Sequence, residues 1–286
     1  MNQNEIWTTL KILEWTREYL SRKGIENARR EAEWMLCAAT GLDRMGLYLN
    51  FEKPLNEVEL ASYRKMIARR AGREPLQHIL GTEEFFGLDF EVTPDVLIPR
   101  HDSETLVQEA LARRSEARSV LDIGTGSGCL AIALAKNLPD AAVTAVDISE
   151  AALTVARRNA ERNSVSVRFL HGSLLEPVRG ELFDLIVSNP PYIPTTEINQ
   201  LEPEVRDFDP RSALDGGIDG LDFYRQLIPA AVSHLAEAGW LLMEVGAGQA
   251  HDVAWLFKES GSYGEPVIIS DTGGIERVVG AVLQDL

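Results

Sequence analysis

The tetrapeptide Asn189-Pro190-Pro191-Tyr192 has the clearest chemical potential in this sequence. It follows residues 183–188, an apolar run rich in β-branched residues that predicts a buried strand, and two prolines without N–H groups end that strand abruptly. Asn189 is thus predicted at a strand end, where open α/β sheets bind ligands. The Asn189 side-chain oxygen and the Pro190 carbonyl can hold the two hydrogens of a planar NH2 group against the Tyr192 ring. The pattern indicates a site for an amide or an exocyclic amine; an ordinary turn is the alternative.

A second candidate site is the glycine-rich segment 124–128, which follows a predicted strand and opens a predicted helix. Its glycines let the backbone approach a ligand at a helix N-terminus. The spacing G-x-G-x-G, followed by Cys129, differs from the dinucleotide fingerprint G-x-G-x-x-G and disfavours NAD. Asp147 ends the next predicted strand, where its carboxylate can accept both hydroxyls of a ribose. Asp122 either braces the glycine turn through backbone N–H groups or contacts the ligand.

Strands and helices alternate beyond Arg118, which predicts a parallel sheet wound by right-handed crossovers. The predicted strands are 119–123, 142–146, 165–170, 184–188 and 240–245. The predicted helices are 103–114, with Ser103 as its cap, 130–138, 150–163 and 220–236. Segments 266–270 and 277–283 flank a Gly273-Gly274 turn and predict a terminal hairpin, which puts one antiparallel strand into the sheet.

Apolar residues at helical spacing predict a small helical bundle before residue 80. Gly24 and Gly41 fall just past the first two helices, where C-terminal caps belong. The third helix is expected within Leu55–Ala71, with Asn56 as its N-cap. This part holds no catalytic chemistry, so it is expected to serve recognition or packing.

The chain of 286 residues exceeds the usual single-domain size. We predict three parts: a helical domain over 1–80, a β-hairpin linker over 81–95 and an α/β domain over 96–286. Residues 1–80 carry 13 basic and 11 acidic side chains, whereas the rest carries 15 and 33. An acidic surface repels phosphate backbones, so a nucleic acid substrate is not expected and a protein with a basic face fits better. The acidity also keeps a protein soluble without any such role.

Further features narrow the class of protein. No apolar run approaches the roughly 20 residues that span a bilayer, and the N-terminal residues lack the pattern of a signal peptide. Cys37 and Cys129 lie in apolar, helix-like surroundings that suit buried thiols, and the five histidines show no ligand spacing. We expect a cytoplasmic monomer without a metal.

In their order and spacing, segment 124–128, Asp147 and Asn189-Pro190-Pro191-Tyr192 resemble the S-adenosylmethionine-dependent methyltransferases with a seven-stranded sheet. Further stretches resemble, within that class, the bacterial peptide chain release factor glutamine methyltransferases of the HemK/PrmC type: 98–104, 188–193, 209–221 and 244–249. The resemblance covers nearly the whole chain, including its helical N-terminal part.

This resemblance implies a Rossmann-like sheet of seven mostly parallel strands, one of them antiparallel, behind an N-terminal substrate-recognition domain. It implies S-adenosyl-L-methionine as methyl donor, S-adenosyl-L-homocysteine as product and a class 1 release factor as partner, methylated on N5 of its GGQ glutamine. The implied substrate-binding residues are Asn189, Pro190, Pro191 and Tyr192, of which Asn189, Pro190 and Tyr192 are catalytic. The implied cofactor-binding residues are Gly124, Thr125, Gly126, Ser127, Gly128, Asp147, Leu174 and Asn189. The chain departs from the family at Ser173, where many members have Asp, and at His101, which replaces a frequent proline.

Three alternatives remain open from the sequence. An N6-adenine methyltransferase would use the same pocket for an adenine amine. A glutamine methyltransferase acting on a ribosomal protein would share the motifs. A binding module could keep the fold without catalysis.

Overall fold

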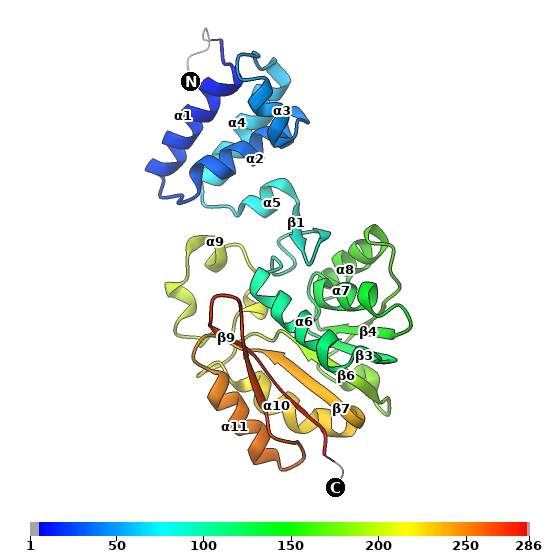
Figure 1. Cartoon of the computed structure of the whole chain (residues 1–286). Helices are drawn as coiled ribbons and strands as arrows, with labels where there is room; N and C mark the ends of the chain where they lie inside the picture. The colour runs from blue at the N-terminus through cyan, green and yellow to red at the C-terminus, as the bar shows by residue number, and fades with distance from the viewer. Residues whose placement is uncertain (1–5, 285–286) are drawn as a thin grey trace. The chain divides into compact units, whose positions relative to one another are not determined.

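The computed structural model describes residues 6–284 and divides into two compact units, with the boundary between Gly81 and Thr82 (Figure 1). The boundary falls one residue beyond the end that we predicted for the helical domain. The hairpin that we predicted as a linker lies in the second unit. Among the described residues, no helix is both long enough and apolar enough to span a membrane.

The first unit is a bundle of short helices around the buried side chains of Ile12, Met35, Leu36 and Tyr63. Its helices are α1 (Thr9–Arg22), α2 (Ala28–Thr40), α3 (Arg44–Leu49), α4 (Glu57–Ala71) and α5 (Leu76–Leu80). The short helices α3 and α5 were not predicted, because five or six residues carry too little periodicity.

The predicted caps of this bundle are confirmed. The side chain of Asn56 accepts from the Glu59 N–H, and the Glu59 carboxylate accepts from the Asn56 N–H, both at 2.9 Å. This capping box satisfies two N–H groups at the start of α4. Gly24 and Gly41 have φ of +79° and +69°, in the left-handed region that favours glycine after a helix.

The second unit contains a sheet of seven described strands in the order β5-β4-β3-β6-β7-β9-β8. They are β3 (Ser119–Ile123), β4 (Ala142–Asp147), β5 (Arg168–His171), β6 (Phe183–Ser188), β7 (Leu235–Glu244), β8 (Val267–Ser270) and β9 (Glu276–Val282). Strand β9 is antiparallel to both β7 and β8, while the pairs from β5 to β7 are parallel. The predicted seven-stranded fold with one antiparallel strand is confirmed.

Helices cover both faces of this sheet (Figure 1). Helices α6 (Glu104–Arg113), α7 (Cys129–Asn137) and α8 (Glu150–Arg162) share a core with Val120, Leu185 and Leu242. Helices α10 (Asp222–Ala231) and α11 (Ala250–Ser260) share a second core with Leu121, Ile186 and Leu241. Because neighbouring residues of a strand point to opposite faces, each strand contributes to both cores. The ends of the strands are thereby held in a rigid frame.

Two predicted boundaries near α10 were wrong, and α11 was not predicted. The helix expected over 220–236 ends at Ala231, and β7 begins at Leu235 instead of at Trp240. Leu235 pairs with Phe183 across a register shift, so β7 starts before the run that resembles a strand. Pairing with β6, a tertiary effect, decides this boundary.

The hairpin of β1 (Thr82–Phe85) and β2 (Leu88–Glu91) buries Phe85 and Phe90 completely. Asn159 of α8 fastens it: its Oδ1 accepts from the Glu91 N–H at 2.6 Å, and its Nδ2 donates to the Glu91 carbonyl at 3.0 Å. Nδ2 also donates to the Ser127 carbonyl at 2.9 Å. One buried side chain thus connects the hairpin to the glycine-rich loop.

Candidate active site

Asn189 lies at the carboxyl end of β6 and, with Leu97 and Ala213, lines two pockets of the second unit. The strand end is fixed because the Ser188 hydroxyl donates to the Ile123 carbonyl of β3 at 2.8 Å. We name the pockets by their residues. The glycine-loop pocket includes Gly124, Gly126, Asp147, Leu174 and Asn189, and the arginine pocket includes Arg100, Asp102, Asn189, Tyr192 and Arg277.

Two glycines of the loop lie in the wall of the glycine-loop pocket. Gly124 and Gly126 have φ of +72° and +54°, and a Cβ at either position would meet no atom within 4 Å. Both glycines therefore leave room beside the pocket that a side chain would occupy. Leu174, with φ of +50°, and Ser173 line another part of its wall.

The other residues of the predicted loop turn toward the protein. Thr125 and Ser127 are buried and do not line this pocket. A Cβ on Gly128 would lie 3.0 Å from Ile132 Cδ1 and 3.1 Å from Ala156 Cβ. Gly128 thus permits close packing of α7 against α8, whereas Gly124 and Gly126 face the pocket.

Two carboxylates shape the loop from different sides. Asp147 accepts from the Gly126 N–H and the Ser149 N–H, both at 2.8 Å, and lines the pocket. Asp122 is fully buried and accepts from the Thr125 hydroxyl at 2.6 Å and the Ala131 N–H at 3.2 Å. Burial raises the pKa of Asp122 to about 7. Asp122 has the bracing role that the sequence left open.

The arginine pocket is lined by ion-paired side chains from distant segments. Arg100 contacts Asp209 at 2.7 Å, and Arg277 of β9 contacts Asp102 at 2.9 Å and Asp271 at 3.1 Å. Burial raises the pKa of Asp209 to about 6, against the lowering effect of Arg100. Sequence reasoning missed Arg277, which lies in no motif that we singled out.

The side chain of Asn189 is held by a residue to which we assigned another role. Its Nδ2 donates to the Ser103 hydroxyl at 3.0 Å. Ser103 occupies the predicted N-cap position of α6, but its side chain makes no capping hydrogen bond. Ser103 is 2% exposed and lies in the 3-10 turn His101–Ser103, where its hydroxyl is directed at the end of β6.

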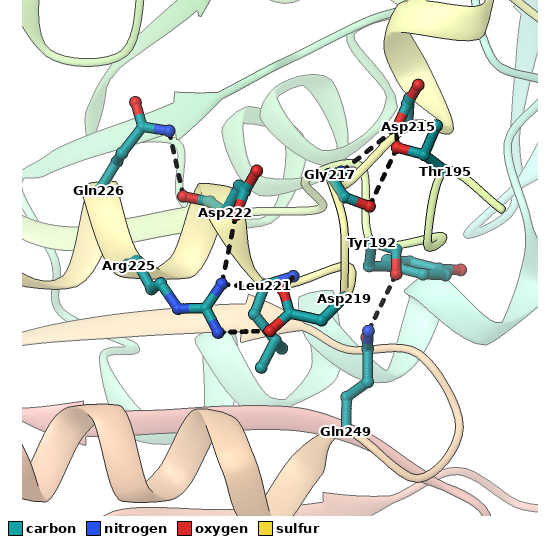
Figure 2. A network of polar contacts seen from close by, with 10 residues as sticks. All are labelled: Tyr192, Thr195, Asp215, Gly217, Asp219, Leu221, Asp222, Arg225, Gln226 and Gln249. Carbon is teal, nitrogen blue, oxygen red and sulfur yellow. Dashed lines mark hydrogen bonds and ion pairs between the residues drawn. The ribbon is translucent and has the colours of Figure 1, made fainter.

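The residues after Asn189 separate between the pockets. Pro190 is buried and lines neither of them, Pro191 lines the glycine-loop pocket, and Tyr192 lines the arginine pocket. Burial raises the pKa of Tyr192 to about 12. Its carbonyl accepts from Gln249 Nε2 at 2.9 Å, a contact seen in Figure 2. The tetrapeptide is therefore braced from the turn that precedes α11.

The long segment 193–219 forms hydrogen bonds within itself and with its neighbours. The Thr195 hydroxyl donates to Asp215 at 2.6 Å, and the Thr195 N–H donates to the Gly217 carbonyl at 2.8 Å (Figure 2). Asp219 pairs with Arg225 at the start of α10 (Figure 2). These contacts give the segment a defined structure that includes α9 (Pro203–Arg206).

Comparisons with known proteins agree with this arrangement. Residues 11–81 match the family model of the PrmC N-terminal domain, and residues 101–201 match the methyltransferase small domain. A methyltransferase from Pyrococcus furiosus shares the fold with a TM-score of 0.52 and 23% identity, over 69% of this chain and 89% of that chain.

Curated relatives extend the similarity to nearly the full length. A release factor glutamine methyltransferase of Geobacter sulfurreducens is 59% identical over 276 residues, which are 96% of this chain and 97% of the relative. A release factor glutamine methyltransferase of Moorella thermoacetica is 44% identical over 90% of this chain and 92% of the relative. The chain is therefore an S-adenosylmethionine-dependent methyltransferase and belongs to the release factor glutamine methyltransferase family.

Proposed function

We propose that this protein transfers a methyl group from S-adenosyl-L-methionine to N5 of the glutamine in the GGQ motif of class 1 release factors. One observation carries the proposal: Asn189 lines both pockets. A residue between two pockets can hold an acceptor in one of them against a donor in the other. The names of the relatives supply the class of acceptor.

The glycine-loop pocket fits the cofactor. Gly124 and Gly126 leave open space where a side chain would intrude, and we assign them the methionine part. Asp147 uses two acceptor positions for backbone N–H groups, and a carboxylate has about four, so two remain for ribose hydroxyls. Leu174 lines the place assigned to adenine. When bound, the cofactor supplies an electrophilic methyl group on a sulfonium.

Residues 189–192 would prepare the amide nitrogen as a nucleophile. An amide lone pair is delocalised into its carbonyl. Asn189 Oδ1 would accept one of the two N–H bonds of the substrate amide, so the nitrogen becomes pyramidal and its lone pair faces the methyl group. The Pro190 carbonyl, which the sequence suggested for the second N–H, belongs to a residue that lines neither pocket. Tyr192, at the wall of the arginine pocket, would pack against the planar amide. The methylated nitrogen then loses its extra proton without a strong base.

The test is transfer of labelled methyl from S-adenosyl-L-methionine to a purified bacterial release factor. The same assay includes the factor with its GGQ glutamine replaced, a ribosomal protein preparation and duplex DNA. We expect label on the intact factor alone. Label on DNA would contradict the proposal and indicate an adenine methyltransferase. Label on a ribosomal protein alone would indicate a glutamine methyltransferase that acts on that protein.

We further propose that residues 1–80 recognise the release factor. Large apolar side chains are exposed on this unit: Met45, Leu49 and Val58 are 66%, 78% and 79% exposed, as at surfaces that bind a partner. Deleting residues 1–80 should abolish methylation of the factor and leave cofactor binding intact, measured by transfer assay and calorimetry. Undiminished methylation by the shortened chain would refute this role.

A further inference from the structure

Glu244 is a buried carboxyl that the proposed mechanism leaves without a role. It ends β7, it is 2% exposed, and its Oε2 has no hydrogen-bond partner among the described residues. Burying a carboxyl costs free energy unless other groups compensate. The Tyr224 hydroxyl donates to the Glu244 carbonyl at 2.8 Å, which fixes the backbone at this point.

Sheet register brings this carboxyl next to Asn189. Strands β6 and β7 are parallel, and Ser188 pairs with Met243. Asn189 and Glu244 are the next residues along these two chains, so they are neighbours across the sheet. Ser103 and Asn189 both act to lower the pKa of Glu244 against the effect of burial, so the two side chains favour its ionised form. Ser103 therefore lies between the two, since it also accepts from Asn189 Nδ2 at 3.0 Å.

The hydrogen bonds available to Glu244, Ser103 and Asn189 decide which end of the Asn189 amide meets the substrate. An ionised Glu244 can only accept, so the Ser103 hydroxyl would donate to it and keep its lone pairs for Asn189 Nδ2. Asn189 Oδ1 is then directed away from them. If Glu244 were neutral, it could donate to Ser103, which would then donate to Oδ1 and turn the amide around.

We propose that Glu244 is a positioning residue: through Ser103 it fixes the Asn189 amide so that Oδ1, and not Nδ2, faces the acceptor site. The inference rests on the proposed function for its catalytic consequence. The orientation of the amide itself can be observed without any substrate.

The proposal makes the orientation depend on pH. Burial raises the pKa of Glu244 to about 7, while Ser103, Arg277 and Asn189 act to lower it and Asp102 acts to raise it. Other titratable groups that interact with Glu244 are Cys129 of α7, Tyr192 after β6 and Tyr224 of α10. Because burial raises the pKa of all three, they stay neutral near pH 7, and Glu244 is the one of these groups that changes charge there.

The first test observes Asn189 directly by NMR of its side-chain amide, assigned by comparison with Asn189→Asp. In the full-length protein, the Asn189 NH2 signals should shift with a midpoint near pH 7. Glu244→Gln should remove this titration, whereas Glu237→Gln, an exposed residue of the same strand, should keep it. An Asn189 signal that ignores pH in the wild type, or that titrates unchanged in Glu244→Gln, overturns the proposal.

The second test measures methyl transfer in a double-mutant cycle. Glu244→Gln should lower kcat by about 10- to 100-fold, as a misplaced catalytic group does, with cofactor affinity and thermal unfolding close to wild type. In an Asn189→Ala background the same substitution should change kcat by less than about twofold, because it acts through Asn189. Ser103→Ala should behave like Glu244→Gln.

The two tests separate the inference from the proposed function. If Asn189→Ala lowers transfer and Glu244→Gln does not, the positioning role is wrong while the proposed function stands. If Glu244→Gln lowers kcat equally in the wild type and in the Asn189→Ala background, the positioning role is also rejected. If no release factor is methylated, the proposed function fails, and the NMR titration still decides whether Glu244 orients Asn189.

Discussion

The two pockets that meet at Asn189 are built in different ways. The glycine-loop pocket includes glycines with positive φ. Its carboxylate Asp147 accepts a hydrogen bond from the N–H of Gly126, which is only 21 residues away in the sequence. The arginine pocket uses long charged side chains, and Arg100 lies 109 residues from its partner Asp209. This difference fits the proposed function, in which the first pocket takes the cofactor and the second takes part of the protein substrate.

The largest effect is expected at Asn189, which lines both pockets. Asn189→Ala removes an acceptor of the substrate amide and should lower methyl transfer by about 10²-fold or more. Calorimetry should find nearly the same cofactor affinity, because Gly124, Gly126 and Asp147 remain. Comparable losses in transfer and in cofactor binding would place Asn189 in the glycine-loop pocket alone.

A pair of glycine variants tests whether the loop divides as described. Gly126→Val strains a residue at φ of +54° and fills open space beside the pocket, so cofactor affinity should fall by about tenfold or more. Gly128→Val is also strained, at φ of +83°, and in addition meets Ile132 and Ala156, so it should lower the free energy of unfolding by about 1–3 kcal/mol.

Calorimetry and thermal unfolding of both proteins distinguish these outcomes. Loss of cofactor affinity in Gly128→Val, with an unchanged melting temperature, would contradict the division between a binding and a packing glycine.

A smaller effect is expected from the arginine pocket. Arg277→Gln leaves Asp102 and Asp271 without their cation and should raise KM for the release factor by about 3- to 10-fold, with cofactor affinity unchanged. Arg225→Gln is the matched control, since its ion pairs are exposed and contribute little. Equal KM values for the two variants would exclude a role of Arg277 in binding the substrate.

The smallest effect concerns stability and pH on the glycine-loop side. The pKa of Asp122 is raised from 3.8 to about 7 by burial, so the folded state favours its neutral form. The contribution of the Asp122 carboxyl to the free energy of unfolding is fully present below about pH 4 and is lost as the pH rises to about 7. Asp122→Asn removes that loss, so its unfolding free energies at pH 5 and pH 8 should differ less than those of the wild type.

Urea unfolding at both pH values measures this difference, with Asp140→Asn, an exposed residue, as control. An identical pH dependence in Asp122→Asn and the wild type would show that Asp122 has an ordinary pKa.

Much of the fold was predictable because the spacing of apolar residues along the sequence indicates its helices and strands. The alternation of strands and helices after Arg118 and the terminal hairpin indicated a sheet with one antiparallel strand, which the structure confirms. The boundaries of β7 and the existence of α11 were not predictable in the same way. Pairing of Leu235 with Phe183 starts β7 where the local sequence does not resemble a strand.

The sequence by itself determined one wall of the glycine-loop pocket, because the glycine-rich loop and Asp147 follow consecutive strands. Val146 pairs with Ile123, so parallel pairing of β3 and β4 is enough to place Asp147 beside the glycine-rich loop. Only the tertiary structure decided the other side of Asn189. Ser103, Glu244 and Arg277 come from three distant elements, and their contacts depend on strand order, on register and on burial, which no local pattern contains.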